Sequence, residues 1–215
     1  MQYYYFYKND DFTNIENLKF SIFSTYINAK NKEYICLFIF NTTKINEELK
    51  TNLVNYYHEV FNGFADVTIL EENQIERTTP KLLYLQRLSA MKEKCMYLSN
   101  NIYIKKTPFI NENEIYFLNN NKLDNNYKIY EPFGLISEHY DDSVFYVPFN
   151  IAEDLLKDID ALKKQYMFSD QLIESILPYI IQTYAKLADI KINLMSNNYF
   201  KILSDKETLF LSGLL

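Results

Sequence analysis

Apolar residues in the first hundred positions alternate between short β-type runs and longer stretches with helical spacing. The short runs predict strands at residues 2–7, 34–40, 67–70 and 95–98. The stretches between them predict helices over residues 15–29, 45–60 and 80–88. Strands that alternate with helices are typical of an α/β fold with a mostly parallel central sheet flanked by helices, because parallel neighbours need a crossover connection.

The second half of the chain is less regular. Strands are predicted at residues 114–118, 143–149 and 190–194. Asn150 has a capping pattern that predicts a helix, and so has Ser169. In the helix after Ser169, Pro178 must introduce a kink or a split, since proline removes an intrahelical hydrogen bond. With no internal repeat and no Gly/Ser-rich linker, we expect one domain over residues 1–215.

The segment around residue 98 organises the chain. The predicted strand at residues 95–98 is apolar on both faces, which is typical of a central strand covered by helices. Ser99, Asn100 and Asn101 follow it, and a further β-type run continues at residues 102–104. Open α/β sheets bind ligands beyond the carboxyl ends of their strands, so these three polar residues mark a candidate site.

Charge and composition exclude several classes of function. A net charge of -6 argues against a general nucleic-acid or anionic-membrane binder, because no large positive field is available for phosphates. The longest purely apolar run, residues 35–40, is too short to span a bilayer, and the amino terminus lacks signal-peptide features. Cys36 and Cys95 lie in apolar runs and are expected to be buried thiols. We therefore expect a cytoplasmic protein.

Familiar catalytic motifs are scarce. His58 and His139 lie far apart, with no Cys or carboxylate at a spacing typical of metal ligands. The chain has only 3 Gly, and none forms a phosphate-binding glycine loop. Serine nucleophile elbows and Cys-x-x-Cys pairs are also absent from the sequence.

Two segments carry a resemblance to a known family. Residues 84–88 read Tyr-Leu-Gln-Arg-Leu, and residues 97–102 read Tyr-Leu-Ser-Asn-Asn-Ile. This frame resembles the family-8 retaining glycosyltransferases, which have Tyr-Tyr-Arg-Leu, a short spacer and Tyr-Leu-Asp-x-Asp-Ile. The resemblance implies a minimal domain of the GT-A fold, the nucleotide-diphospho-sugar transferase fold. Both aspartates of the family's Asp-x-Asp motif are missing here.

The resemblance also implies site residues. Those implied to bind the nucleotide sugar are Lys8, Asp10, Asp11, Phe12, Arg87, Ser99 and Asn101. Asp170 and Gln171 match an Asp-Gln pair that lies near the sugar and the acceptor, and they are the implied catalytic residues. Each position also has an ordinary structural interpretation: an acidic turn before a helix, a cation at a helix end, or an acid that complements a helix dipole.

The departures from the family pattern concern the metal. Ser99 and Asn101 replace the aspartates that would hold a divalent cation, and neutral oxygens bind hard cations less well than carboxylates do. The family's carboxyl-terminal His-x-x-Gly-x-x-Lys segment has no counterpart after Met195. We therefore expect no metal ligands and disfavour a Mn²⁺ or Mg²⁺ cofactor. Arg87 and Lys8 would then stabilise the diphosphate.

The resemblance implies that the protein transfers a sugar from a nucleotide sugar, with a UDP-sugar as donor, to a glycan or protein acceptor. Two other functions stay open at this point. One is a catalytically inactive glycosyltransferase fold that serves as a binding or assembly module. The other is a small interaction protein whose α/β frame only imitates the family's order of elements.

Overall fold

The computed structural model of this chain describes most of its regular elements. The described residues are 2–8, 15–28, 35–40, 48, 51, 52, 55, 59, 67–72, 79–119 and 140–203. The chain divides into two compact units. The first unit comprises Met1–Glu76, Met96–Pro108 and Asn198–Leu215, and the second comprises Arg77–Cys95 and Phe109–Asn197. The single domain expected from the sequence stays a prediction.

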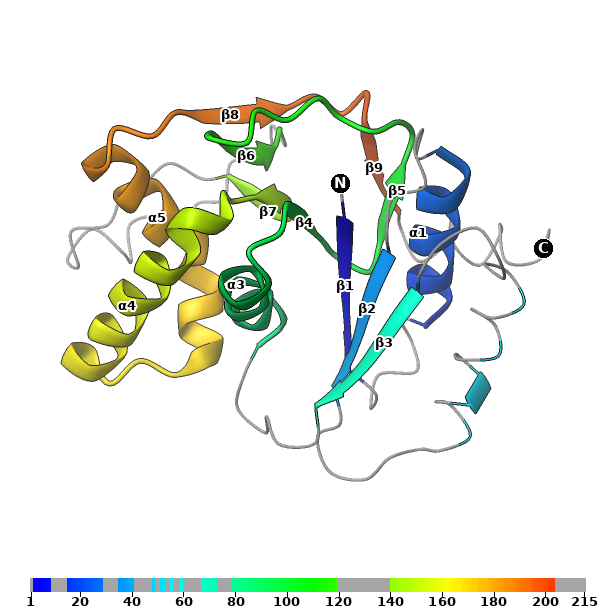
Figure 1. Cartoon of the computed structure of the whole chain (residues 1–215), viewed down its shortest axis with the longest axis horizontal. Coiled ribbons are helices and arrows are strands. Elements are labelled where there is room, and N and C mark those ends of the chain that lie inside the picture. Colours follow the sequence, from blue (N-terminus) through cyan, green and yellow to red (C-terminus); the bar gives the residue numbers. More distant parts are fainter. Residues whose placement is uncertain are drawn as a thin grey trace. The chain divides into compact units, whose positions relative to one another are not determined.

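Parallel strands form the centre of the first unit. These strands are β1 (Gln2–Lys8), β2 (Ile35–Phe40) and β3 (Val67–Glu72). β2 pairs with β1 and with β3, in both cases in parallel, and the three strands lie side by side in Figure 1. On the other side of β1 lies β4 (Cys95–Leu98), all four residues of which are buried. The sequence prediction of a fully buried strand at 95–98 is confirmed.

A two-stranded ribbon follows the turn after β4. β5 (Ile102–Ile104) pairs antiparallel with β9 (Phe200–Ile202) in a sheet of its own. Beyond the strands, the ribbon is extended by hydrogen bonds from the Leu203 N–H to the Asn101 carbonyl at 2.8 Å and from the Lys105 N–H to the Tyr199 carbonyl at 2.8 Å. The sequence analysis predicted β5 as a continuation of the β-type run at residues 95–98. It did not predict β9, a strand of three residues that stands alone in the sequence.

Side chains of α1 (Ile15–Asn28) bind the backbone of β5. The Ser21 hydroxyl donates to the Ile102 carbonyl at 2.5 Å, and Asn28 Nδ2 donates to the Ile104 carbonyl at 2.8 Å. The Ile104 N–H in turn donates to Ser24 Oγ at 2.9 Å. Polar side chains spaced three and four residues apart on one helical face thus take the place of a neighbouring strand.

The second unit contains a mixed sheet. Its strands are β6 (Ile115–Leu118), β7 (Asp141–Tyr146) and β8 (Ile192–Met195), with β6 in the middle. β6 pairs antiparallel with β7 and parallel with β8. The predicted mostly parallel sheet is therefore not what the structure has. Both directions occur, because β6 and β7 run against each other, as do β5 and β9.

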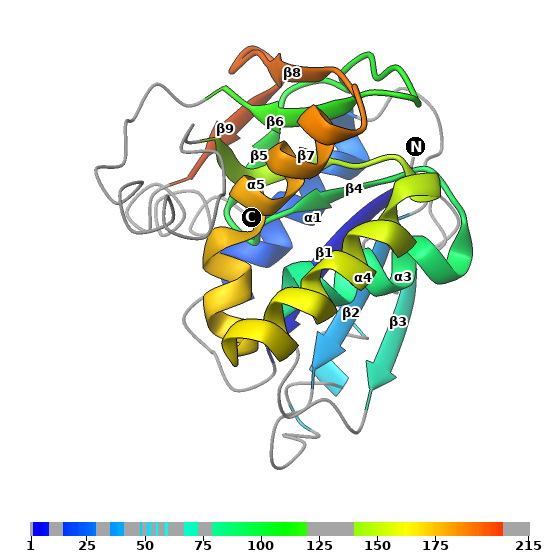
Figure 2. The same ribbon diagram turned by 90° about the vertical axis from the view of Figure 1, so that its left-hand side faces the viewer.

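The helices of the second unit pack on one another. These helices are α3 (Pro80–Met91), α4 (Phe149–Tyr166) and α5 (Asp170–Leu187), and α4 lies against both others in Figure 2. Tyr84 of α3 is fully buried, and its ring packs edge-on against Phe145 of β7 at a centroid distance of 5.2 Å. Interlocked aromatic rings of this kind give the unit an apolar core.

Some expected helix features are confirmed and others are wrong. Ser169 caps α5 as predicted, since its hydroxyl accepts from the Leu172 N–H at 3.2 Å. Asn150 is not a cap: α4 begins at Phe149, and Pro148 takes the N-cap position without a side-chain hydrogen bond. Pro178 does not split α5, which continues as one helix with this proline inside it, and the kink that was the alternative stays a prediction.

Other sequence predictions fall largely on residues outside the described part of the chain. Of the helix predicted over 45–60, the five described residues are all helical. His58 and His139 lie outside the described residues. Cys95 is a buried thiol, as expected. A search of the described residues for a helix long and apolar enough to cross a membrane finds none.

Candidate functional site

The polar turn after β4 lies where the sequence placed it. Ser99 directly follows the buried strand, and the turn is closed by a hydrogen bond from the Ile102 N–H to the Ser99 carbonyl at 3.3 Å. Ser99 and Asn101 are half-buried. The backbone carbonyl of Asn101 also accepts a hydrogen bond from the Leu203 N–H, and this bond joins the turn to the residue that follows β9. These two hydrogen bonds hold the backbone that carries the Ser99 hydroxyl and the Asn101 amide.

Lys8 ends a strand that is a neighbour of β4. It is the last residue of β1 and pairs in register with Phe40 of β2. Lys8 and Ser99 thus both belong to the ends of adjacent strands in the first unit. Asp10, Asp11 and Phe12 lie outside the described residues, so their proposed contacts with a nucleoside stay predictions.

Arg87 belongs to the second unit. It is half-buried on α3, between the fully buried side chains of Leu85 and Leu88. Its neighbours on the helix therefore anchor α3 in the apolar core, while the long Arg87 side chain reaches partly into solvent. A planar guanidinium held in this way suits pairing with a phosphate or a carboxylate.

Asp170 and Gln171 form the first turn of α5, also in the second unit. The Asp170 carboxylate forms an ion pair with Lys163 from the end of α4, and its side chain is 12% exposed. It complements the positive end of the α5 dipole, next to the Ser169 cap. Gln171 is exposed. The ion pair fixes the corner between α4 and α5 and leaves the Gln171 amide available to a ligand.

The predicted site residues are divided between the two units. Lys8, Ser99 and Asn101 belong to the first unit, whereas Arg87, Asp170 and Gln171 belong to the second. Each group keeps within its unit the place that the sequence assigned to it, at a strand end or at the start or side of a helix. That the two groups act on one ligand stays a prediction.

The turn does not fit a divalent cation. Mn²⁺ and Mg²⁺ are hard cations whose affinity depends largely on the charge of their oxygen ligands. The side chain of Ser99 offers a neutral hydroxyl and that of Asn101 a neutral amide. The backbone carbonyl of Asn101 accepts a hydrogen bond from the Leu203 N–H. Among the described residues, no group of three His, Cys, Asp or Glu side chains is arranged to hold a metal ion.

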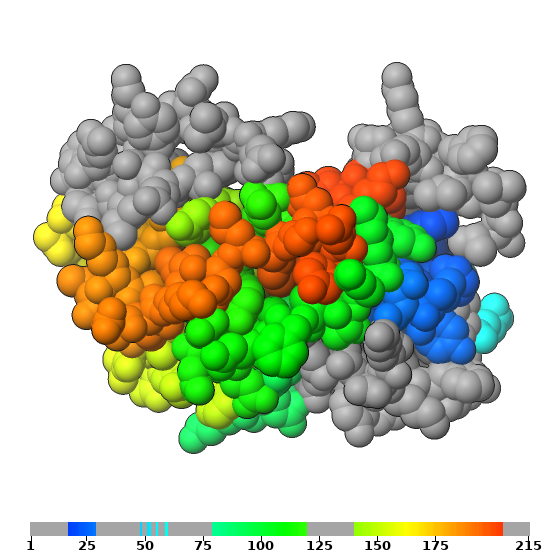
Figure 3. Space-filling view, turned by 90° about the horizontal axis from the view of Figure 1, so that it is seen from above, coloured from blue at the N-terminus to red at the C-terminus, as the bar shows by residue number. Residues whose placement is uncertain are grey.

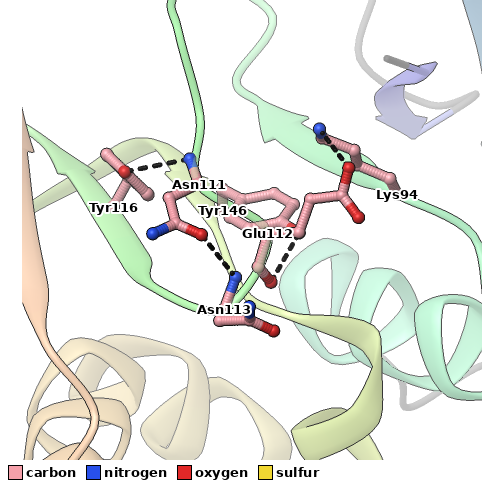
Figure 4. A network of polar contacts seen from close by, with 6 residues as sticks. All are labelled: Lys94, Asn111, Glu112, Asn113, Tyr116 and Tyr146. Atoms are coloured by element: carbon pink, nitrogen blue, oxygen red, sulfur yellow. Dashed lines mark hydrogen bonds and ion pairs between the residues drawn. The ribbon is translucent and has the colours of Figure 1, made fainter.

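A second polar cluster in the second unit escaped the sequence analysis. It surrounds the turn at residues 111–114, which leads into β6 (Figure 4). Lys94 binds the Glu112 carboxylate at 2.9 Å, and the Tyr146 hydroxyl donates to the Glu112 carbonyl at 3.3 Å. The hydrogen bond and the charge of Lys94 hold the pKa of the Glu112 carboxyl below its ordinary value. These contacts tie the turn to β7 and to the residue before β4.

Glu114 continues this cluster toward β8. Its carboxylate accepts from the Tyr116 hydroxyl at 3.0 Å and from Asn193 Nδ2 at 2.7 Å. Desolvation raises the pKa of the Glu114 carboxyl, but these hydrogen bonds and the charge of Lys191 outweigh it, so that the pKa lies below its ordinary value. Burial raises the pKa of Tyr146 and of Tyr116. Since the polar groups satisfy one another, the cluster is a structural clamp on the turn.

Comparison with known proteins finds similarity in structure but not in sequence. No protein-family model matches the chain, and no curated protein sequence matches it. The galactosyltransferase LgtC, in complex with donor and acceptor sugar analogs, has a TM-score of 0.57 and 11% identity, covering 89% of this chain and 73% of its own. Mouse xyloside xylosyltransferase 1, in its apo form, has a TM-score of 0.56 and 8% identity, covering 92% of this chain and 86% of its own.

A third structure is an active-site mutant of LgtC. It has a TM-score of 0.52 and 12% identity, covering 79% of this chain and 65% of its own. At such low identities the likeness shows the fold alone. The chain has an α/β fold with a mixed sheet that is similar to the fold of these glycosyltransferases.

Proposed function

We propose that this protein is a glycosyltransferase-like protein of the GT-A fold that transfers a sugar from a nucleotide sugar, with a UDP-sugar as the donor, to a glycan or protein acceptor. The observation that carries the proposal is the likeness to two sugar transferases over 89% and 92% of the chain. The polar turn directly after the buried strand β4 supports it, because strand ends of this kind bind ligands in α/β sheets.

In this proposal the chain's own side chains replace a metal clamp. Arg87 and Lys8 supply positive charge to the diphosphate that leaves when the sugar is transferred. Fixed charges that face developing negative charge are the usual means of lowering such a barrier. Ser99 and Asn101 donate hydrogen bonds to the same group through their hydroxyl and amide, since neither fits a divalent cation.

The remaining residues bind the nucleoside and the sugar of the donor. Asp10, Asp11 and Phe12 hold the nucleoside, with the aromatic ring against the base. Asp170 and Gln171 bind the sugar and position the acceptor. The Asp170–Lys163 ion pair keeps this part of the site in place.

The second candidate function is a catalytically inactive glycosyltransferase fold that serves as a binding or assembly module. The observation in its favour is the pair of neutral residues, Ser99 and Asn101, in the turn after β4. Such a module would still bind a nucleotide sugar but would leave it intact. The third possibility, an interaction protein that only imitates the fold, predicts no nucleotide binding at all.

A thermal-shift screen of UDP, UDP-glucose and UDP-galactose, with EDTA or with Mn²⁺, separates these functions. A ligand at a hundred times its Kd stabilises the native state by about 2.7 kcal/mol. For a chain of this size the melting temperature should then rise by about 5–10 °C. We expect this rise in EDTA as well as in Mn²⁺. No rise with any of the three compounds would contradict the proposal.

Consumption of the donor distinguishes a transferase from a binding module. The UDP-sugar that raises the melting temperature is incubated with the protein, and free UDP is measured over time. Release of UDP above the rate without protein supports the transferase. Binding without release of UDP, in the presence of a panel of glycan acceptors, favours the inactive module.

A further inference from the structure

The turn between α4 and α5 exposes a group of apolar side chains. Met167 is 90% exposed, the largest exposed fraction of any large apolar residue in the described part of the chain. Tyr166 before it and Leu172 in the first turn of α5 are each 38% exposed, and Phe168 is half-buried. We call these four residues the apolar corner. In Figures 1 and 2 this turn lies at the end of α4 and α5 that is away from β6 and β8.

The backbone at Met167 is one that stability alone does not assign to methionine. Met167 ends α4 in the left-handed conformation, with φ 56° and ψ 35°. Glycine is the usual residue there, because a Cβ atom crowds the backbone in this conformation. A side chain that is 90% exposed recovers little of that cost by packing. The other described non-glycine residues with positive φ, Lys92 and Asp189, are polar and exposed, so an apolar side chain at this position indicates a role in binding.

Local contacts hold the apolar corner in one shape. The rings of Tyr166 and Phe168 stack on each other, with centroids 5.4 Å apart and an interplanar angle of 24°. The Ser169 hydroxyl accepts from the Leu172 N–H at 3.2 Å and so fixes the first turn of α5. A surface that is ordered before it binds loses less conformational entropy when it docks.

The charge next to the apolar corner is positive. Lys163 and Asp170 neutralise each other in their ion pair. Lys164 is exposed, and it forms no ion pair with any residue that the structure describes. Glu174 lies two positions beyond Leu172 and therefore on a different side of α5. A single cation thus borders the apolar corner, and charge complementarity favours a partner with anionic groups.

This combination of side chains matches the chemistry of a phospholipid surface. Exposed apolar side chains enter the boundary between headgroups and acyl chains, and tyrosine lies at the level of the headgroups. A lysine at the rim pairs with lipid phosphates. A net charge of -6 gives the protein no long-range attraction to an anionic membrane, so apolar contact has to supply most of the binding. Such binding is local to one corner, unlike the general membrane binding that the net charge argues against.

We propose that the apolar corner docks this protein on a phospholipid surface. Met167 and Leu172 enter the apolar layer, Tyr166 lies among the headgroups, and Lys164 pairs with lipid phosphates. This docking goes beyond the proposed function and does not depend on it. Only one consequence rests on the proposed function: the implied catalytic residues at the start of α5 then meet an acceptor glycan that is carried on a membrane lipid.

Co-sedimentation with phosphatidylcholine vesicles, with or without phosphatidylglycerol, measures the docking. We expect binding to both kinds of vesicle, and tighter binding to those that contain the anionic lipid. The double variant Met167→Ser, Leu172→Ser should bind both kinds about tenfold more weakly, because two apolar side chains no longer leave water. Lys164→Gln should bind about fivefold more weakly to the anionic vesicles alone.

The matched control is Phe109→Ser, Leu187→Ser, at two apolar residues of the second unit that are 86% and 83% exposed. Leu187 ends α5, and this end of the helix, away from the apolar corner, lies at the molecular surface in orange in Figure 3. The control should bind vesicles like the unaltered protein. Absence of binding to the vesicles, or an equal loss in the control, overturns the proposal.

The variant Met167→Gly separates docking from folding. Glycine relieves the crowding of the left-handed backbone, so the midpoint of urea denaturation should rise while binding to vesicles weakens. A fall in the midpoint would mean that the Met167 side chain stabilises the fold, and this result overturns its role in docking.

A second copy of this chain is the other occupant that the apolar corner could have. Analytical ultracentrifugation without lipid tests for it, and we expect no dimer that depends on the apolar corner. A dimer that Met167→Ser, Leu172→Ser dissociates would overturn the proposal, because the corner would then be covered by protein.

Failure of the docking is distinguishable from failure of the proposed function. The rise in melting temperature with UDP requires no lipid, so Met167→Ser, Leu172→Ser should leave it unchanged. A rise with UDP without binding to vesicles overturns the docking alone. Binding to vesicles that depends on the apolar corner, without any effect of UDP or UDP-sugars, supports the docking and contradicts the proposed function.

Discussion

Ser24 accepts a 2.9 Å hydrogen bond from the backbone N–H of Ile104, a residue 80 positions away in the sequence. The hydroxyl is fully buried, and it completes the backbone pairing of a strand that β9 pairs on its other edge. A helix side chain and a short strand thus provide hydrogen-bond partners for the backbone of β5 on its two edges. This arrangement supports the turn at Asn101.

The first prediction is that Ser24→Ala destabilises the protein. The substitution leaves the buried Ile104 N–H without its acceptor, which costs about 1–3 kcal/mol. Urea denaturation measures the loss, and faster hydrogen exchange of the Ile104 amide locates it. Ser175→Ala is the matched control, because the Ser175 hydroxyl is exposed and donates within its own helix to the Leu172 carbonyl. Equal losses in the two variants would refute the role given to Ser24.

The second prediction concerns Tyr84 and alkaline pH. The buried Tyr84 hydroxyl donates to the Cys95 carbonyl at 2.9 Å, and burial raises the pKa of Tyr84 well above 10.0. The folded state therefore holds this proton more tightly than the unfolded chain does. The stability that follows is complete below pH 10.0 and is lost as the pH rises above that value.

Urea denaturation across a pH series checks this dependence. Tyr84→Phe should lower the free energy of unfolding by about 1–2 kcal/mol at neutral pH, because the Cys95 carbonyl loses its donor. It should also flatten the decline above pH 10.0. Tyr166→Phe, at an exposed tyrosine, should change neither. An undiminished alkaline decline in the Tyr84 variant would contradict the assignment.

The third prediction separates nucleotide binding from mere likeness of fold. If the protein recognises a nucleotide diphosphate without a metal, each positive group matters more. A hydrogen bond to a charged group contributes about 1.5–3 kcal/mol, so Arg87→Ala should weaken UDP binding by about one to two decades. Arg77→Ala, outside the motif at residues 84–102, should have little effect. Equal affinities of the two variants would leave Arg87 as an ordinary surface cation.

The fourth prediction concerns the metal. Calorimetry should find no micromolar affinity for Mn²⁺ in the unaltered protein, because Ser99 and Asn101 offer neutral oxygens. The double variant Ser99→Asp, Asn101→Asp restores two carboxylates and should make the effect of UDP on the melting temperature depend on Mn²⁺. Asn197→Asp, Asn198→Asp adds the same charge at exposed positions and should not. Tight Mn²⁺ binding that is lost in Asn101→Ala would disprove the metal-free site.

The sequence alone determined those features that depend on neighbouring residues. The spacing of apolar residues and the length of the apolar runs predicted the helices and most strands. This works because the apolar face of an element repeats along its own sequence, whatever packs against it. The fully apolar run at 95–98 fixed β4 as a buried strand, and Ser169 could be recognised as a cap because its acceptor serves an N–H three residues away. The polar turn at Ser99 followed from the same local reasoning.

Tertiary structure alone decided how β5 and the strands of the second unit pair. Backbone hydrogen bonds form between any residue types, so sequence gave no sign that β5 pairs with β9 or that β6 runs against β7. The bonds from Ser21, Ser24 and Asn28 to β5 likewise join segments far apart in the chain. The hydrogen bond from the Lys105 N–H to the Tyr199 carbonyl is a further example, because the local sequence around either residue does not indicate the other.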